Sequence, residues 1–266
     1  MSNSTSLEIA ESLSAADRSE LRVAVEQLEG ESFAMKVASK IGMPIEALLR
    51  RLPAGAHDKI AAAVDHALRQ CLRVALLGSS GTPRKRAHTL ATAATGAAGG
   101  FFGLPGLAIE LPVTTTIMLH SIAQIAREHG EDLSQPEPAL SCLEVLAFGG
   151  QGKAADSAYY ATRAALAQVT RDAATYIAEK GLAKESAPAI VSFLSRVAAR
   201  FGIEVSEKAA AQMVPVAGAL GGLTLNVLFT RHYQRLAEGH FTVRALERKY
   251  GAALVQAEYA RALADR

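Results

Sequence analysis

Three polar side chains that lie in otherwise apolar stretches are the first candidates for chemistry: Glu110, His120 and Asn226. Glu110 is the single formal charge in residues 87–119. Burying such groups without partners costs free energy, so each is expected to find a partner in the fold. One interpretation is that they hydrogen-bond to helix ends across neighbouring helices. The other is that they line a cavity and bind the polar end of a ligand.

Three cations, Arg84, Lys85 and Arg86, stand directly before the apolar stretch. Basic residues beside an apolar segment are suited to anionic lipid head groups, and we expect these three to contact a membrane. A glycine-rich linker at residues 78–83 precedes them, but the phosphate-loop spacing Gly-x-x-x-x-Gly-Lys-Ser/Thr is absent. A solvated, charged turn is the alternative interpretation.

Signatures of other catalytic or metal sites are missing from the sequence. The histidines show no His-Glu-x-x-His spacing, and no Gly-x-Ser-x-Gly motif occurs. Cys71 falls on the apolar stripe of an expected helix, which indicates a core thiol rather than a nucleophile. We therefore expect no metal ion and no cofactor, and we favour a non-enzymatic protein. A hydrolase or metal enzyme built on Glu110 and His120 is the less favoured alternative.

Composition favours tightly packed helices. Half of the 266 residues are hydrophobic, but only 5% are aromatic and none is Trp, so Ala, Leu, Val and Ile must build the core. A net charge of +2 gives no argument for nucleic acid as a partner. Two cysteines are too few for a disulfide framework, and residues 1–6 do not resemble a signal peptide. We expect a cytoplasmic protein.

Helical periodicity recurs along the chain. Apolar residues repeat at three- and four-residue steps over residues 56–77, 154–180 and 190–201, and Gly202 is expected to end the last of these helices. Ser14 followed by Asp17 resembles a capping box at the start of a polar N-terminal helix. No period-two alternation persists. The sequence therefore predicts an all-α fold in a single compact multi-helix domain.

The centre of this domain is expected to be a glycine-rich helical hairpin. Gly103, Pro105 and Gly106 disfavour an uninterrupted helix, so we expect one helix over residues 83–102 and a second from Pro112 to about Glu128. Glu110 would then stand just ahead of a helix N-terminus, where exposed N–H groups favour a carboxylate.

A membrane span is the alternative for this stretch. Residues 87–109 carry no formal charge and are long enough to cross a bilayer. Ala, Gly and Thr dominate them, however, and insert weakly. A buried hairpin is favoured over a span.

A second uncharged segment, residues 209–230, is expected to form a helix and echoes the first segment. Gly218-Ala219-Leu220-Gly221-Gly222 matches Gly96-Ala97-Ala98-Gly99-Gly100. Residues 247–251 likewise correspond to residues 126–130, at almost the same offset. The repetition suggests an internal duplication with two central glycine-rich hairpins, and coincidence among common Ala and Gly residues is the alternative.

Several of these motifs together resemble the EcsC protein family. They are Gly96-Ala97-Ala98-Gly99-Gly100, Ile109-Glu110-Leu111-Pro112, Ile122-Ala123, His129-Gly130, Pro215-Val216-Ala217-Gly218-Ala219 and Asn226. The resemblance covers the chain from about Ala56 onward, so we expect an N-terminal helical extension over residues 1–53 and an EcsC-like helical domain over residues 54–266. Relatives typically carry Asp where this chain has Glu110.

The resemblance implies a bacterial protein linked to transport, because the family is named after a gene beside an ABC transporter pair implicated in protein secretion. The family brings no agreed activity. We expect an accessory protein that associates with membrane lipid or with a membrane transporter, peripheral at the inner face of the cytoplasmic membrane. A soluble carrier that encloses an apolar, lipid-like ligand is the alternative.

Overall fold

The computed structural model describes residues 12–77, 103–149, 158–181, 185–213 and 217–266. The regular secondary structure of these residues is α-helix and one 3₁₀ turn, with no β-strand among them. The helices are α1 (Ala15–Leu28), α2 (Phe33–Ile41), α3 (Ile45–Leu49), α4 (Ala56–Leu77), α6 (Gly103–Glu128), α7 (Pro136–Glu144), α8 (Ala158–Lys180), α9 (Pro188–Gln212), α10 (Ala217–Tyr250) and α11 (Ala252–Ala264). The prediction of an all-α fold is confirmed.

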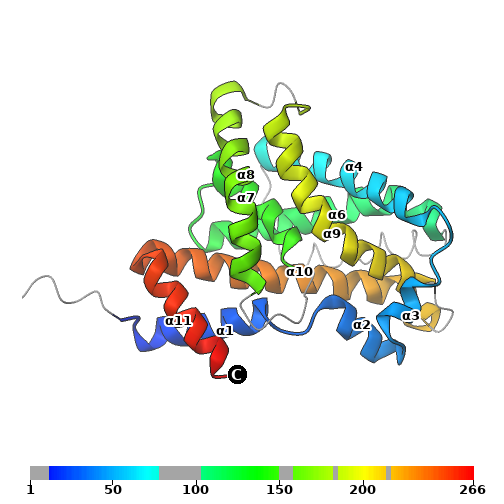
Figure 1. Cartoon of the computed structure of the whole chain (residues 1–266), viewed down its shortest axis with the longest axis horizontal. Coiled ribbons are helices and arrows are strands. Elements are labelled where there is room, and N and C mark those ends of the chain that lie inside the picture. The colour runs from blue at the N-terminus through cyan, green and yellow to red at the C-terminus, as the bar shows by residue number, and fades with distance from the viewer. Residues whose placement is uncertain (1–11, 78–102, 150–157, 182–184, 214–216) are drawn as a thin grey trace, which may run out of the picture.

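Helix α10 is the longest helix and forms the axis of the described structure. Figure 1 shows it lying horizontally, with α1 along its lower side and α6 along its upper side. Helix α4 packs on the other side of α6, and α9 crosses both α4 and α10. The buried apolar side chains from all of these helices form one hydrophobic cluster. The N-terminal helices therefore pack on the same core as the rest of the described chain.

A glycine sets the close approach of α1 to α10. A Cβ atom at Gly239 would lie 2.7 Å from Leu28 Cγ and 3.0 Å from the Ala24 carbonyl oxygen. No side chain fits at that separation, so only glycine allows the two helices to approach this closely.

Several local predictions are confirmed. Helix α4 has the bounds that its apolar periodicity indicated, and Cys71 on it is fully buried. At the start of α1, the Ser14 hydroxyl accepts a hydrogen bond from the Asp17 amide, as an N-cap should.

The expected helix start at Pro112 is wrong. The described part of helix α6 runs from Gly103 through Pro112 to Glu128 without a break. One missing hydrogen bond at Pro112 does not end a helix that is packed on both sides, by α4 and by α10. Glu110 consequently lies inside α6 and not ahead of a helix N-terminus.

The expected helix end at Gly202 is also wrong, because α9 continues to Gln212. Phe201, Val205 and Ala209 extend the buried stripe of α9 past the glycine. Their burial outweighs the roughly 1 kcal/mol that a glycine costs inside a helix. Residues 209–230 are therefore not one helix: they contain the end of α9 and the beginning of α10. The other glycine-rich run, residues 96–100, lies outside the described residues.

Candidate functional site

A fully buried ion pair joins α6 to α9. Lys208 Nζ donates a hydrogen bond to Glu110 Oε1 at 2.8 Å. The two side chains are only 0% and 2% exposed, respectively. A charge without its counterion would cost several kcal/mol at such a site, so each of these residues depends on the other.

Helix α10 closes this site from a third side. The Lys208 ammonium lies 5.1 Å from the centre of the Phe229 ring, within range of a cation–π interaction. Asn226 is fully buried three residues before Phe229, and so lies on the same face of α10. Glu110 and Asn226, two of the residues singled out from the sequence, thus occupy helices that meet around Lys208.

Burial has the largest effect on the Lys208 ammonium. Desolvation lowers the pKa of Lys208, and the attraction of Glu110 opposes that shift. The arrangement can hold two helices together and can present a fixed charge pair to the adjacent core.

Lys208 was missed in the sequence. It lies seven residues after Phe201 and four after Glu204, both of which are buried. Lys208 therefore continues the buried stripe of α9 at helical spacing. A charged residue in phase with a buried stripe was the available signal, and the expected helix end at Gly202 hid it.

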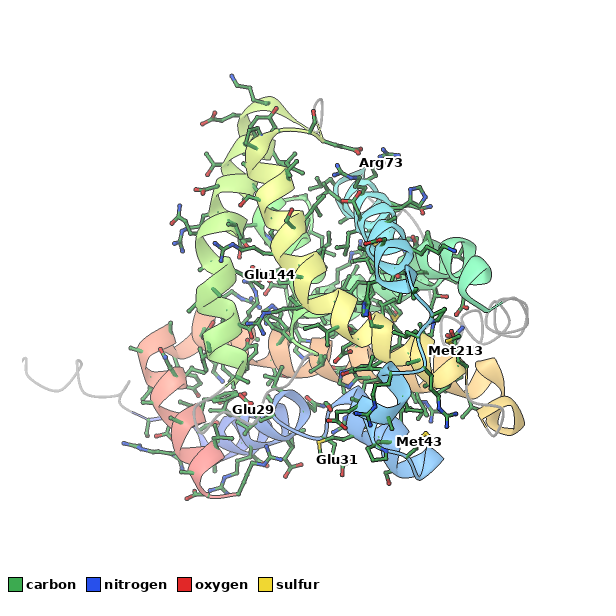
Figure 2. All side chains as sticks on the ribbon, turned by 45° about the vertical axis from the view of Figure 1, so that its right-hand side comes forward. Glu29, Glu31, Met43, Arg73, Glu144 and Met213 are labelled. Carbon is green, nitrogen blue, oxygen red and sulfur yellow. The ribbon has the colours of Figure 1, made fainter. Side chains whose placement is uncertain are left out.

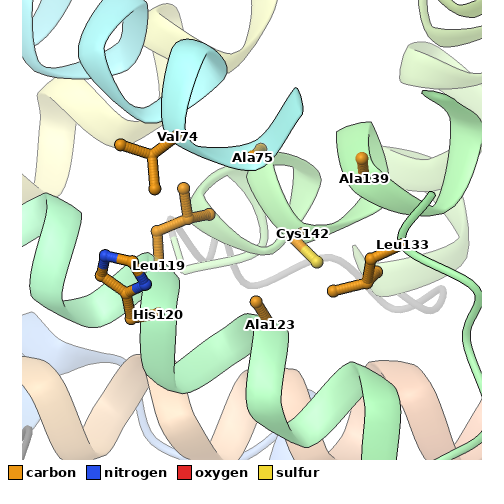
Figure 3. Close-up of a pocket in the computed structure, with 8 residues that line it drawn as sticks. All are labelled: Val74, Ala75, Leu119, His120, Ala123, Leu133, Ala139 and Cys142. Carbon is orange, nitrogen blue, oxygen red and sulfur yellow. The ribbon is translucent and has the colours of Figure 1, made fainter. Parts of the chain in front are cut away.

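His120 belongs to a different place. It lies ten residues after Glu110 on α6, or about 15 Å along the helix axis at 1.5 Å per residue. Figure 3 shows it at a narrow pocket between α4, α6 and α7, together with Leu119 and Cys142. Burial, followed by the nearby charge of Arg127, lowers the pKa of His120. This separation along α6 sets it apart from the ion pair, so the three predicted ligand-binding residues are divided between two sites. The predicted membrane contacts Arg84, Lys85 and Arg86 lie outside the described residues.

A second buried polar cluster, the His240 cluster, links α7, α8 and α10. Tyr159 OH lies 2.9 Å from His240 Nδ1, and Ser141 Oγ lies 2.9 Å from His240 Nε2. The Ser141 hydroxyl donates to Glu144 Oε2 at 3.2 Å. Since Ser141 has one hydrogen to give, it accepts from the Nε2–H of His240, whose Nδ1 then accepts from Tyr159.

This cluster is neutral at the imidazole. Burial lowers the pKa of His240 well below its ordinary value, with Arg163 and Arg244 adding to the effect. The order of donors points the Ser141 hydrogen toward Glu144 and away from the imidazole, whereas a serine nucleophile needs its base as acceptor. Within the residues that the structure describes, this arrangement therefore fits a structural hydrogen-bond chain better than a nucleophile and its base.

The cysteines are equally unsuited to attack. Burial raises the pKa of both Cys71 and Cys142 to about 12, so the thiolate is scarce near neutral pH. Within the described ranges, no group of three His, Cys, Asp or Glu residues is arranged to hold a metal ion. The described helices also include none that combines the length and apolarity needed to cross a bilayer.

A family model supplies the evidence for identity. The model described as EcsC protein family matches residues 16–246. The chain belongs to the EcsC protein family. Comparisons with curated proteins and with solved structures found no match.

The EcsC match also includes α1 to α3. It begins about forty residues before the resemblance that was assigned from motifs, which started near Ala56. Leu21 and Val25 of α1 are buried in the same cluster as the later helices. The boundary between residues 1–53 and 54–266 stays a prediction.

Proposed function

We propose that this EcsC-family chain is a non-enzymatic helical accessory protein that associates with membrane lipid or with a membrane-protein partner in transport or secretion. The observation that carries the proposal is the uncharged stretch of residues 87–109 directly after Arg84, Lys85 and Arg86. Apolar residues beside cations suit an anionic bilayer surface, where each basic residue contributes on the order of 1 kcal/mol.

The buried ion pair holds in place the helix that follows this segment. The stretch leads into α6, and Glu110 on α6 is held by Lys208 of α9. Contacts of α6 with α4 and α10 add to this anchoring. A contact made by residues 87–109 would thus be transmitted to the helical body through α6.

Flotation with liposomes tests the proposal. The wild-type chain should float with vesicles that contain anionic lipid, and added salt should weaken its binding because the attraction is electrostatic. Replacing Arg84, Lys85 and Arg86 by Ser should weaken binding by about 3 kcal/mol, roughly a hundredfold. A matched control replaces the exposed cations Arg50 and Arg51 of the helical body by Ser. If the wild-type chain binds neither neutral nor anionic vesicles, the proposal is wrong.

A groove supports the carrier as a second candidate function. It lies between α4 and α9, has a volume of about 650 Å³, and is lined by residues that include Ile60, Val64, Ala198 and Gly202. That volume falls in the range of small-molecule sites, roughly 300–1,000 Å³, and an apolar lining suits a lipid-like chain.

The groove can be filled to test this candidate. A Cβ atom at Gly202 would meet nothing within 4 Å, so Gly202→Leu should extend into the groove without disturbing α9. Mass spectrometry of solvent extracts should find a lipid-like molecule in the purified wild-type chain and less of it in Gly202→Leu, with Gly202→Ala as the control. Equal amounts of the molecule in the wild type and in Gly202→Leu, or none in the wild type, would exclude the groove as the carrier site.

A further inference from the structure

A small polar pocket lies between α7, α8 and α10, on the solvent side of the His240 cluster. Its polar lining is Glu137, Glu144, Arg163, Thr170, Arg171 and Arg244, and its volume is about 160 Å³. We call it the arginine pocket. Figure 2 labels Glu144, which lies beside α8 in that view.

Every carboxylate oxygen in this pocket already accepts a hydrogen bond from the protein. Glu144 accepts hydrogen bonds from Ser141 on one oxygen and from Thr170 on the other. Glu137 accepts from Arg244 on both of its oxygens, at 2.9 and 3.1 Å. A ligand that donates hydrogen bonds would therefore have to share these oxygens with the protein's own donors.

Two arginines at the pocket, in contrast, carry more N–H donors than the described acceptor atoms use. A guanidinium carries five N–H donors. Arg163 uses one N–H on each Nη to hold Glu247, at 2.8 and 2.9 Å, and Arg171 uses one to hold Gln168 Oε1 at 2.9 Å. Neither residue makes a further hydrogen bond within the described part of the chain.

One of the arginines at the pocket also carries a positive charge that none of the described carboxylates balances. Arg163 is balanced by Glu247, and Arg244 by Glu131 and Glu137. Arg171 is exposed and makes no ion pair with a carboxylate among the described residues. Its positive charge is the uncompensated one at the pocket. Burial raises the pKa of Glu144 at the floor, and the hydrogen bond from Thr170 opposes that shift.

The floor of the pocket is preorganised. Through Ser141, Glu144 is linked to His240 and then to Tyr159, and these side chains are all buried. Arg163 lies 5.5 Å from the Tyr159 ring centre, in addition to its two bonds with Glu247. A ligand would therefore meet guanidinium groups that are already ordered, which reduces the entropy lost on binding.

We propose that the arginine pocket binds a phosphate group, with Arg163 and Arg171 as its donors. Planar guanidinium forks match the oxygens of phosphate and form strong charge-assisted hydrogen bonds with them. At about 30 Å³ of liquid volume per water, the pocket has room for roughly five waters, and a phosphate has five heavy atoms. The phosphate comes either from a soluble molecule or from a lipid head group.

Calorimetric titration with inorganic phosphate tests the site. At constant ionic strength in chloride, the full-length chain should bind one phosphate saturably, whereas acetate should bind at least tenfold more weakly. Arg171→Gln should weaken phosphate binding at least tenfold without changing the melting temperature, because Arg171 is exposed. Arg22→Gln, which removes an exposed cation on α1, is the matched control and should bind as the wild type does.

Arg163 gives a second test. Arg163→Lys keeps the charge opposite Glu247 but loses the fork, so it should weaken phosphate binding while circular dichroism still reports a folded chain. If the wild type gives no saturable binding up to about 10 mM phosphate, roughly tenfold above a millimolar dissociation constant, the proposal is wrong. Unchanged affinity in Arg171→Gln would also overturn it.

Vesicles distinguish the two sources of phosphate. If a lipid head group occupies the pocket, inorganic phosphate should release the chain from vesicles of phosphatidic acid in phosphatidylcholine, and Arg171→Gln should float less. If the source is soluble, neither change should affect flotation, although the calorimetric result stands. Both arms leave Arg84, Lys85 and Arg86 unchanged, so at constant ionic strength the differences that they measure report on the pocket and not on the proposed membrane contact.

Discussion

The two halves of α10 bury polar groups by different means. The first half, around Asn226 and Phe229, faces a complete ion pair between Lys208 and Glu110. The second half carries His240, a neutral imidazole held between two hydroxyl groups. Both regions are shielded from water, but one depends on two charges that must occur together, whereas the other surrounds a neutral imidazole with hydroxyl groups.

This difference predicts how each region tolerates the substitution of one of its residues. Removing one member of a buried ion pair leaves an uncompensated charge, whereas removing one member of a neutral chain leaves a polar group that water or a neighbour can partly satisfy. The ion pair should therefore be the more fragile of the two regions.

The largest expected effect is at Lys208. Lys208→Met strands the Glu110 carboxylate in the core and should lower the free energy of unfolding by about 3–5 kcal/mol. Combining it with Glu110→Leu replaces both charges by apolar groups and should recover most of that loss. Urea denaturation of the two variants measures both effects. A double variant as unstable as Lys208→Met would show that the charges do not depend on one another.

A smaller effect is expected at His240. His240→Phe removes the acceptor of the Tyr159 hydroxyl and the donor to Ser141, and should lower the free energy of unfolding by about 1–3 kcal/mol. The same denaturation experiment applies, with Tyr159→Phe as a milder control that removes a single hydroxyl group. A loss at His240 as large as the loss at Lys208 would remove the distinction between the two regions.

The smallest expected effect is a pH-dependent change in stability at Glu207, which precedes Lys208 in the chain. Burial, and after it the charges of Glu204 and Glu46, raises the pKa of Glu207 from 4.5 to about 7. The fold thus favours neutral Glu207: its contribution to stability is complete below pH 4.5 and is lost as the pH rises through about 7.

Glu207→Gln should match the wild type near pH 4.5. At pH 8 it should be more stable by on the order of 1–2 kcal/mol, a value reduced to allow for partial exposure. Thermal melts of both chains at the two pH values give the comparison. His240→Phe should add no such pH dependence, because the low pKa of His240 keeps the imidazole neutral over this range. If the difference in stability between the wild type and Glu207→Gln were the same at both pH values, the raised pKa of Glu207 would be contradicted.

Local features of the fold were predictable from the sequence. The apolar period of α4, its buried Cys71 and the Ser14 cap all depend on residues within a few turns of one another. Glu110 stood out because it is a lone charge in an apolar stretch, and the structure does bury it. Such signals are short-range in the chain, which is why periodicity and capping rules detect them.

The partners of those residues were not predictable in the same way. Lys208 is 98 residues from Glu110, and His240 is 99 residues from Ser141. No local pattern encodes which helices meet. The two wrong helix boundaries, at Pro112 and Gly202, have the same origin: tertiary packing outweighed a local helix-breaking preference.

The central claim is that residues 87–109 meet the membrane, and a fluorescent label within them tests it most directly. Cys71 and Cys142 are buried with pKa values raised to about 12, so a cysteine introduced by Ala93→Cys should react selectively with an environment-sensitive maleimide dye. A label at Ser19→Cys, on the exposed side of α1, is the control. On addition of anionic vesicles, the account predicts a blue shift and higher emission from the label at position 93, and no change at position 19. Vesicles that bind the protein but leave the emission at position 93 unchanged would contradict it.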